Sequence, residues 1–459
     1  MAKTKIVLIG AGSVIFGPAL LSDIFQCKEL SGCTIGLCDI SADGLHLITQ
    51  LAHRLNQEWD SGMHIIASTD RKELLPDAEF AIVSIAVDRE RLWRQDWEIP
   101  FKHGIRQPLG ENGGPGAFFQ TARNALPMLE ICQDMETHCP DTYLLNFTNP
   151  VARMTLVARR YSQIKTVGLC HQIGLGYDIV AMVLAKDLGL APLEPPEKEW
   201  DFHSVTYPYQ EAIRNLIDIK AAGINHFTFI LDIRRKDTGE DLYPLFRQRI
   251  ASFPPGYQPL SRQILDIFGL FPATGDGHLS EYTHWMHNPQ TEPWKKYNLS
   301  LYDWDGAQRW RAARQKEVED IVAGGPLIAR LKEPSGEMAV PIILGIKDNR
   351  NLYNHAVNIP NEGYITNLPQ GAIVEVPGLI SALGVRGLGV GSLPEGIAAL
   401  CRTQIDVASL AVDAAVTGDR QVALQALLVD PMVNDIDQAR SLLDELLQLQ
   451  ADYLPQFQR

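Results

Sequence analysis

Short runs of aliphatic and β-branched residues alternate with longer amphipathic stretches through the first 170 residues. Apolar runs bounded by polar turns are typical of strands, and apolar positions three and four apart are typical of helices. The pattern predicts six strands, at Lys5–Ile9, Thr34–Cys38, His64–Ser68, Phe80–Ala86, Thr142–Asn146 and Lys165–Cys170. It predicts helices between them at Pro18–Phe25, Asp43–Asn56 and Thr121–Met135. This alternation predicts a doubly wound parallel sheet of the Rossmann type.

A proline-rich stretch that begins at Ala191 interrupts this pattern. Later segments carry mixed signals, with strand-like runs at Phe227–Ile233 and Ile373–Val376 and helical periodicity at Gln308–Ala323 and Leu393–Leu449. A chain of 459 residues is too long for one ordinary core. We therefore expect an α/β fold with two domains, a Rossmann domain over residues 1–195 and an α+β domain that binds substrate and metal over residues 196–459.

The charge and cysteine content narrow the classes of function. The formal charge is −14, from 41 basic and 55 acidic residues, and an acidic chain repels nucleic-acid phosphates. The seven cysteines are odd in number and form no CxxC pair, which favours reduced thiols. The N-terminus lacks a signal-peptide pattern, and no apolar run is long enough to cross a membrane. We expect a cytoplasmic protein with no nucleic-acid or membrane partner.

A glycine-rich turn follows the first predicted strand. Gly10, Gly12, Ser13 and Gly17 stand between that strand and a helix, where glycines allow a tight turn and a close approach to a pyrophosphate. Asp39 ends the second strand, where a carboxylate can accept hydrogen bonds from ribose hydroxyls. This position favours NAD over NADP. The alternative is a structural glycine turn in another α/β domain.

Two later strands also end in polar motifs. Asn146 and Asn149 flank Phe147-Thr148 before Pro150, and an asparagine amide suits a nicotinamide or a sugar hydroxyl. The alternative is an Asn-Pro turn that merely stops a strand. Cys170 ends the sixth strand, at the sheet edge where α/β proteins bind ligands. A cysteine thiolate together with the imidazole of a distant residue, His226, would suit a divalent transition metal, although both residues could be structural.

Two glycine-containing loops carry further candidates. The segment Gly275–Tyr282 gathers titratable side chains, including Asp276 and Tyr282, as a general base requires. The segment Gly110–Gly116 contains Glu111 and precedes a helix that carries Arg123, so it could close over a ligand. An exposed polar loop and a flexible connection are the respective alternatives.

Taken in order, these segments resemble glycoside hydrolase family 4, and the late signature Asn367–Pro377 extends the resemblance over nearly the whole chain. The resemblance implies a homodimer or homotetramer whose second domain is like that of lactate and malate dehydrogenases. It implies NAD⁺ and a divalent cation, usually Mn²⁺, with Cys170 and His226 as the metal ligands. Glycosidases of this NAD-dependent family depart from the usual two-carboxylate scheme.

The resemblance also implies a role for each candidate residue. Asp276 is expected to be the base that removes the C2 proton, with Tyr282 as its rival, and His171 or Glu111 would assist the leaving group. The residues expected to bind NAD are Gly10, Gly12, Ser13, Asp39 and Asn146. The residues expected to bind substrate are Asn149, Arg123 and Asn225.

The four residues from Cys170 track specificity within that family. This chain has Cys170-His171-Gln172-Ile173, which groups it with the Cys-His enzymes that act on unphosphorylated glycosides. We therefore expect hydrolysis of an α-galactoside, α-glucoside or α-uronide. Two alternatives remain open: an NAD-dependent dehydrogenase of a hydroxy acid or sugar, and a non-catalytic NAD-binding protein.

Overall fold

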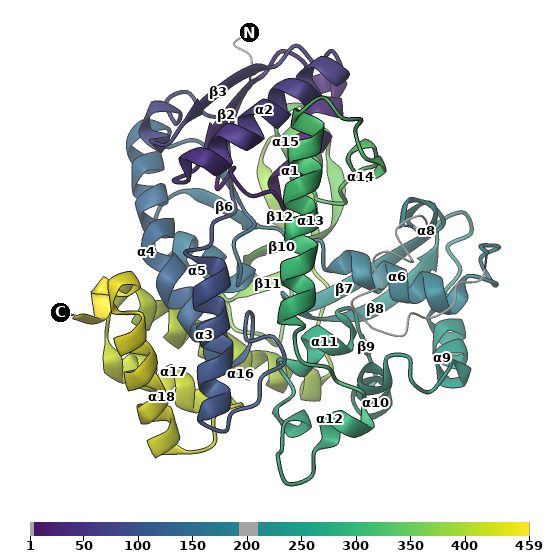
Figure 1. The fold of residues 1–459 in the computed structure, drawn as a ribbon. Helices are drawn as coiled ribbons and strands as arrows, with labels where there is room; N and C mark the ends of the chain where they lie inside the picture. Colours follow the sequence, from purple (N-terminus) through teal and green to yellow (C-terminus); the bar gives the residue numbers. More distant parts are fainter. Residues whose placement is uncertain (1–3, 192–209, 459) are drawn as a thin grey trace.

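The computed structural model describes residues 4–191 and 210–458, and one sheet runs through both parts (Figure 1). Its strands follow the order β3-β2-β1-β4-β5-β6-β10-β11-β7-β8-β9, and β12 pairs with β11. The domain boundary expected at residues 195 and 196 lies outside the described residues. The division into two domains therefore stays a prediction.

The first six strands are parallel and form a Rossmann sheet, which confirms the predicted fold class. They are β1 (Lys5–Ile9), β2 (Thr34–Cys38), β3 (His64–Ser68), β4 (Phe80–Val83), β5 (Tyr143–Asn146) and β6 (Lys165–Gly168). The helices of this half are α1 (Gly17–Gln26), α2 (Ala42–Glu58), α3 (Arg89–Lys102), α4 (Gly114–His138), α5 (Val151–Tyr161) and α6 (Ile173–Leu184). The parallel order places the carboxyl ends of all six strands at one edge, where ligands of such sheets bind.

Antiparallel strands extend the sheet beyond β6. They are β10 (Leu352–Pro360), β11 (Ile373–Ser381), β12 (Gly384–Gly387), β7 (Ile217–Ile224), β8 (Phe227–Arg235) and β9 (Phe271–Pro272). Two of the junctions are narrow: β10 meets β6 at the pair Asn358–Gly168, and β11 meets β7 at the pair Glu375–Gly223. Asn358 and Glu375 are themselves cross-strand partners. One row of residues therefore crosses the sheet from the end of β6 to the end of β7.

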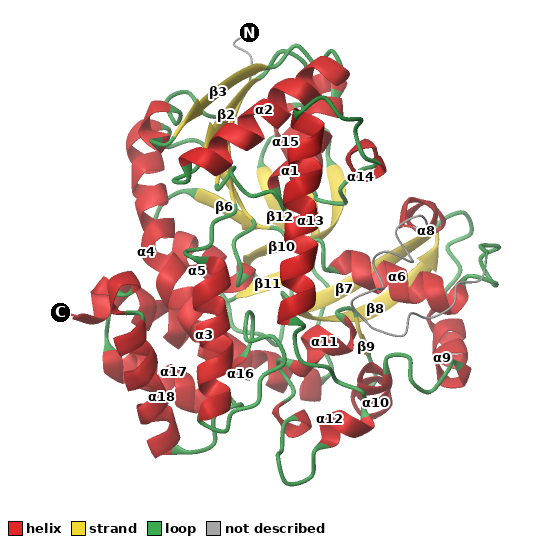
Figure 2. Cartoon of the chain, viewed as in Figure 1, coloured by secondary structure: helices red, strands yellow, loops and turns green. Residues whose placement is uncertain are grey.

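The remaining helices surround this extended sheet (Figure 2). They are α8 (Gln210–Leu216), α9 (Tyr243–Ser252), α10 (Pro259–Phe268), α11 (Gly275–Ser280), α12 (Pro293–Lys296), α13 (Trp304–Val322), α14 (Ala329–Lys332), α15 (Ala339–Lys347), α16 (Glu395–Thr417), α17 (Arg420–Val429) and α18 (Ile436–Leu449). Helices α16 to α18 lie beside α3, α4 and α5 of the first half. Among the described helices, none is long and apolar enough to cross a membrane.

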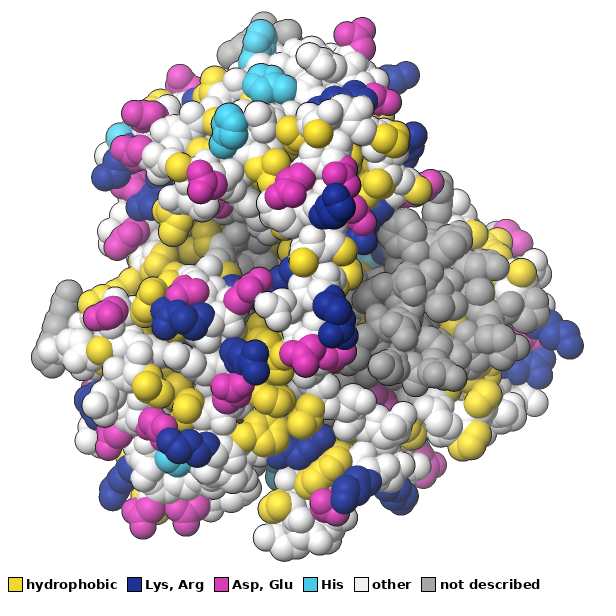
Figure 3. All heavy atoms as spheres, viewed as in Figure 1, with side chains coloured by type: hydrophobic (Ala, Val, Ile, Leu, Met, Phe, Trp, Pro, Cys, Tyr) yellow, Lys and Arg dark blue, Asp and Glu magenta, His cyan; other side chains and the backbone are white. Residues whose placement is uncertain are grey.

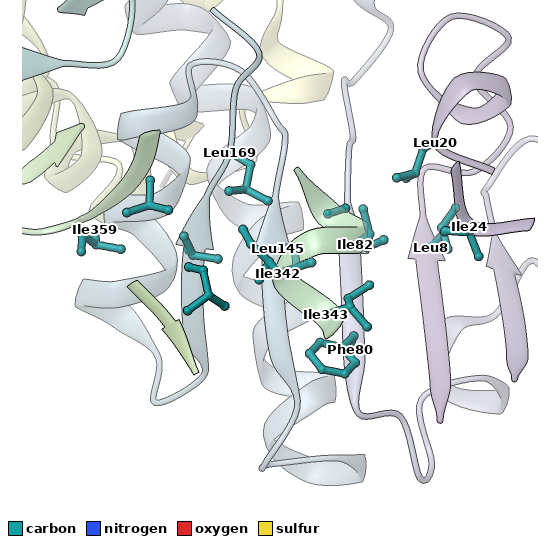
Figure 4. Close-up of a cluster of buried hydrophobic side chains, with 14 of the residues drawn as sticks. Leu8, Leu20, Ile24, Phe80, Ile82, Leu145, Leu169, Ile342, Ile343 and Ile359 are labelled. Carbon is teal, nitrogen blue, oxygen red and sulfur yellow. The ribbon is translucent and has the colours of Figure 1, made fainter. Parts of the chain in front are cut away.

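The hydrophobic core joins the two halves of the chain. Figure 4 shows Leu8 and Ile82 of the Rossmann strands in the same buried cluster as Ile342 and Ile343 of α15 and Ile359 of β10. A second cluster joins α4 to the C-terminal helices. On the face shown in Figure 3, the surface is hollowed between the N-terminal strands and α3.

Candidate active site

The glycine turn after β1 leaves the end of that strand open to a ligand. Gly10 has φ +87°, and a Cβ there would lie 2.0 Å from the carbonyl oxygen of Ser84. The Gly12 N–H donates to Asp39 Oδ2 at 2.8 Å, and the Ser41 N–H donates to Oδ1 at 2.8 Å. Ile40, which follows Asp39, is 93% exposed although it is a large hydrophobic residue. The carboxyl ends of β1 and β2 therefore present a glycine turn, the fixed carboxylate of Asp39 and the apolar side chain of Ile40 together.

Ser13 stabilises the turn that leads into α1. Its Oγ accepts hydrogen bonds from the N–H groups of Ile15 and Phe16 at 3.3 and 3.4 Å. These contacts hold the turn open between Gly12 and the first residue of α1, Gly17. A helix N-terminus with unpaired N–H groups is favourable for a phosphate.

The two asparagines at the end of β5 differ in position. Asn146 is fully buried: its Oδ1 accepts from the Thr148 N–H at 2.9 Å and its Nδ2 donates to Thr155 Oγ1 at 3.1 Å. These bonds give Asn146 a structural role, and its expected contact with NAD stays a prediction. Asn149 is half-buried, and a cis peptide bond joins it to Pro150 at the carboxyl edge of the sheet.

Cys170 and His226 lie next to each other, as the expected metal site requires. Cys170 Sγ and His226 Nε2 are 3.3 Å apart. Cys170 follows β6, and His226 belongs to the two-residue turn between β7 and β8, where its φ of +61° is left-handed. Residues 56 positions apart thus meet at one edge of the sheet.

The row that crosses the sheet positions this pair. Asn225, the residue before His226, donates from Nδ2 to Glu375 Oε2 at 2.8 Å. Asn358, which pairs with Gly168 at the end of β6, donates to the same oxygen at 2.9 Å. One carboxylate therefore joins the ends of β6 and β7.

The surroundings of the pair affect its protonation. Burial raises the pKa of the Cys170 thiol well above its usual value, and the nearby Glu375 carboxylate adds to this effect. Burial lowers the pKa of His226 well below 6.5, and His278 and His171 lower it further. A neutral imidazole is the form that binds a metal, and a bound cation would deprotonate the thiol. Within residues 4–191 and 210–458, no group of three or more His, Cys, Asp or Glu side chains forms a metal-binding cluster.

His278 and Glu281 complete the site, and the sequence analysis gave them no role. The ring of His278 stacks on His226, with 4.4 Å between the ring centroids and 3° between the planes. His278 Nδ1 lies 3.0 Å from Glu281 Oε2. Glu281 is 1% exposed, and its Oε1 accepts from the N–H groups of Glu111, Asn112 and Gly113 at 3.1 to 3.4 Å. Their spacing of three residues, on one side of a helical turn, is the signal that could have identified them.

Asp276 and Tyr282, the expected base and its rival, have other contacts. Asp276 Oδ2 accepts from the Leu260 N–H at 2.8 Å, and Oδ1 accepts from Ser261 N and Oγ at 2.7 and 2.6 Å. The carboxylate therefore holds the first turn of α10, and its expected role as the base stays a prediction. The Tyr282 hydroxyl lies 3.4 Å from the carbonyl oxygens of Asn112 and Asn225. Burial raises the pKa of Tyr282 well above 10.

The two candidates for leaving-group assistance both have charged partners. His171 Nδ1 lies 2.8 Å from Glu337 Oε1, and its side chain is 59% exposed. The Glu337 carboxylate raises the pKa of His171. Glu111 is buried, and its Oε1 lies 2.5 Å from Nη1 of Arg89. The exposed imidazole can therefore hold a proton, whereas Glu111 is paired with Arg89.

Arg123 lies in the core. Its guanidinium forms a two-pronged ion pair with Asp96, at 2.9 and 2.5 Å, and both side chains are fully buried. Gln450, next to α18, accepts a further hydrogen bond from it at 2.7 Å. Arg123 therefore joins α4 to α3 and the C-terminal helices, and its expected contact with substrate stays a prediction.

Comparisons with known proteins show the family of the chain. The chain matches the family models "Family 4 glycosyl hydrolase" over residues 5–189 and "Family 4 glycosyl hydrolase C-terminal domain" over residues 221–433. It is 32% identical to an alpha-glucosidase of Erwinia rhapontici, over 98% of this chain and 99% of that protein. It is 30% identical to an alpha-galactosidase of Rhizobium meliloti (strain 1021), over 100% and 90%.

Among solved structures, the fold is similar to that of a 6-phospho-alpha-glucosidase from gut microorganisms in complex with NAD and Mn²⁺. The TM-score is 0.80 at 21% identity, with 98% of this chain and 99% of that chain covered. The resemblance inferred from the order of the motifs is confirmed by the family models and the curated relatives. The chain is an enzyme that belongs to family 4 of the glycosyl hydrolases.

Proposed function

We propose that this enzyme hydrolyses unphosphorylated α-glycosides with NAD⁺ and a divalent cation, by transient oxidation at C3 followed by elimination. The observation that carries the proposal is the contact between Cys170 and His226 at the carboxyl edge of the sheet. A buried thiol and a neutral imidazole have no other evident use beside an open nucleotide-binding edge.

The residues that follow the carboxyl ends of β1 and β2 fit NAD. The backbone at Gly10 and Gly12 has no side chain to block a pyrophosphate, and Asp39 is fixed where the ribose hydroxyls would lie. The exposed Ile40 offers an apolar surface for the adenine ring. The binding of NAD and Mn²⁺ by the similar 6-phospho-alpha-glucosidase supports this fit.

The metal pair leaves coordination positions for substrate. Cys170 Sγ and His226 Nε2 supply two ligands, and catalytic metal sites keep an open position. When bound, NAD⁺ would accept a hydride from C3 and the cation would polarise the oxygens at C2 and C3, which acidifies the C2 proton. Asn149, at the same edge, would hold the sugar.

His278 is our candidate for the base that removes this proton, in place of Asp276. It lies against the metal ligand His226, whereas the carboxylate of Asp276 holds α10. Glu281 orients the imidazole through Nδ1 and stabilises its protonated form, as a carboxylate does for a catalytic histidine. His171, whose pKa the Glu337 carboxylate raises, would donate a proton to the glycosidic oxygen as the aglycone leaves.

The substrate class follows from the Cys-His motif and from the curated relatives. The similar alpha-glucosidase and alpha-galactosidase support an α-hexoside as substrate. The expected homodimer or homotetramer is also part of this proposal, and light scattering on the purified protein measures it.

The test is hydrolysis of p-nitrophenyl α- and β-glucosides, galactosides and uronides, with 6-phosphorylated versions. NAD⁺, Mn²⁺ and a thiol reductant are each present or withheld. We expect release from an unphosphorylated α-glycoside that requires both NAD⁺ and Mn²⁺ and leaves no net NADH. Release without NAD⁺, or steady accumulation of NADH, would contradict the proposal.

A further inference from the structure

A small cavity is lined in part by Asn225, the residue before His226. It has a volume of about 30 Å³ and is lined by Asn112, Pro150, Arg153, Asn225 and Tyr282, among others. Pro150 and Asn225 adjoin Asn149 and His226 in the chain, so the cavity borders the proposed sugar site. It also adjoins an open pocket of about 560 Å³ between α5, α16 and the turn before β11. Ile224 and Gln404 line both.

The walls of this cavity hold buried polar atoms without partners. Asn112 is 4% exposed, and neither Nδ2 nor Oδ1 of its side chain has a hydrogen-bond partner in the described part of the chain. Arg153 is 3% exposed, and its Nη1 has none there either. A buried polar group left without a partner costs about 1–3 kcal/mol. Such a group beside a catalytic site indicates a ligand.

The charge around Arg153 limits what that ligand can be. Asp430 is 1% exposed, and its negative charge acts on Arg153, although no ion pair between the two occurs in the structure. Asp430 Oδ2 likewise has no hydrogen-bond partner among the described residues. The negative charge of Glu281 also acts on Arg153. These carboxyl groups offset the charge of the Arg153 guanidinium, so the cavity offers little net positive charge to an anion.

We propose that this cavity receives a non-reacting hydroxyl of a neutral sugar, and that Asn112 and Arg153 determine specificity for it. Arg153 Nη1 and Asn112 Nδ2 need an acceptor, whereas Asn112 Oδ1 needs a donor, and a hydroxyl provides both. A carboxylate or phosphate would leave Oδ1 unpaired. The inference rests on the proposed function, in which the C2 and C3 oxygens take part in the reaction. The group in the cavity is therefore the hydroxyl at C4 or C6.

The experiment is a substrate–variant cycle on the full chain loaded with NAD⁺ and Mn²⁺. The substrates are the p-nitrophenyl α-hexoside that the wild-type enzyme hydrolyses best and its 4-deoxy and 6-deoxy analogues. We expect loss of the recognised hydroxyl to lower kcat/KM of the wild type by about 10- to 100-fold. In Asn112→Ala and Arg153→Met, the same loss should change kcat/KM by less than about threefold, because the partners are already gone.

The variants are chosen so that folding does not decide the outcome. Asn112 has no side-chain partner to lose, so Asn112→Ala should keep the wild-type melting temperature even if Arg153→Met does not. Arg159→Met, on the same helix at an exposed position, is the matched control and should discriminate like the wild type. Calorimetric binding of the product monosaccharide and its deoxy analogues to the NAD-loaded protein gives a second readout with the same expected pattern.

The outcomes separate this inference from the proposed function. If no glycoside is hydrolysed with NAD⁺ and Mn²⁺, the proposed function fails. If the parent is hydrolysed but both deoxy analogues react equally well, or if Asn112→Ala keeps the full discrimination, the cavity holds only water and the inference is overturned. A wild-type preference for the uronide or the 6-phosphate over the neutral hexoside would also overturn it.

Discussion

At the scale of single residues, Glu375 is the group on which the metal pair depends. Its carboxylate accepts a hydrogen bond from Asn225, in the turn between β7 and β8. It accepts a second one from Asn358 of β10, which pairs with the end of β6. Glu375→Ala leaves both buried amides without an acceptor and should weaken Mn²⁺ binding at least tenfold, as loss of a supporting group typically does. The change should also cost about 1–3 kcal/mol of stability.

Titration of Mn²⁺ into the purified variant, together with urea unfolding, measures both effects. Glu375→Gln, whose amide oxygen can still accept, is the control and should retain most of the metal affinity. Unchanged Mn²⁺ affinity in Glu375→Ala would show that the row does not position the pair.

Asp23 should make stability depend on pH. It lies in α1. Burial raises its pKa from 3.8 to about 6, although hydrogen bonds from Ser335 act in the opposite direction. Because the folded state holds this proton more tightly, the stability that Asp23 contributes is complete below pH 3.8 and is lost as the pH rises through 6. Asp23→Asn should therefore be more stable than the wild type by about 1–3 kcal/mol at pH 8 and equal to it at pH 3.5.

Urea unfolding of both proteins at the two pH values gives the difference directly. Other carboxylates contribute equally to both proteins and cancel. A constant difference at the two pH values would contradict the assigned pKa of Asp23.

The sequence predicted the position of the site better than the role of each side chain. Cys170 could be placed at a strand end, and the family resemblance implied its pairing with His226. The partners of Arg123, Asn146 and Asp276 could not be read from the pattern, because Asp96, Thr155 and the start of α10 meet them only in the folded chain. A polar residue in a glycine-containing loop can hold a helix as readily as it binds a ligand.

At the scale of elements, the packing of the C-terminal helices α16 to α18 requires one tight turn between α16 and α17. Gly418 has φ +73° there, and a Cβ would lie 1.9 Å from the carbonyl oxygen of Gln456. An alanine in the left-handed conformation costs roughly 1–2 kcal/mol. Gly418→Ala should lower the free energy of unfolding by more than this, because the backbone at Gln456 must also move away from the new Cβ. Gly239→Ala has the same φ of +73° and open space around it, so it measures the backbone cost alone.

Chemical denaturation of the two variants compares them on one scale. Equal losses of unfolding free energy in both variants would mean that the backbone at Gln456 moves away from the new Cβ without cost.

All six Rossmann strands were predicted, although β4 and β6 end earlier than expected, at Val83 and Gly168, whereas other elements were missed. β1, β2 and β3 match their predicted ranges because each is a short apolar run between polar turns. β10 escaped prediction because Asn354, His355 and Asn358 interrupt its apolar pattern, and their partners lie in distant segments. α3 was missed because its sequence is strongly polar and contains Pro100.

At the scale of the whole molecule, the two halves should unfold together. Both large core clusters contain residues from the Rossmann strands or helices and from the C-terminal half. We therefore expect calorimetry of the full chain to show one cooperative transition. Two separate transitions would mean that the shared clusters do not couple the halves.

The row from Gly168 to Gly223 has a consequence for the cell. Cys170 follows an early strand and His226 lies in a later hairpin, and the carboxylate that joins these two strand ends, Glu375, is made later still. A chain still emerging from the ribosome, or one trapped halfway, therefore lacks the row that links them. Completing the sheet and completing this site are one event.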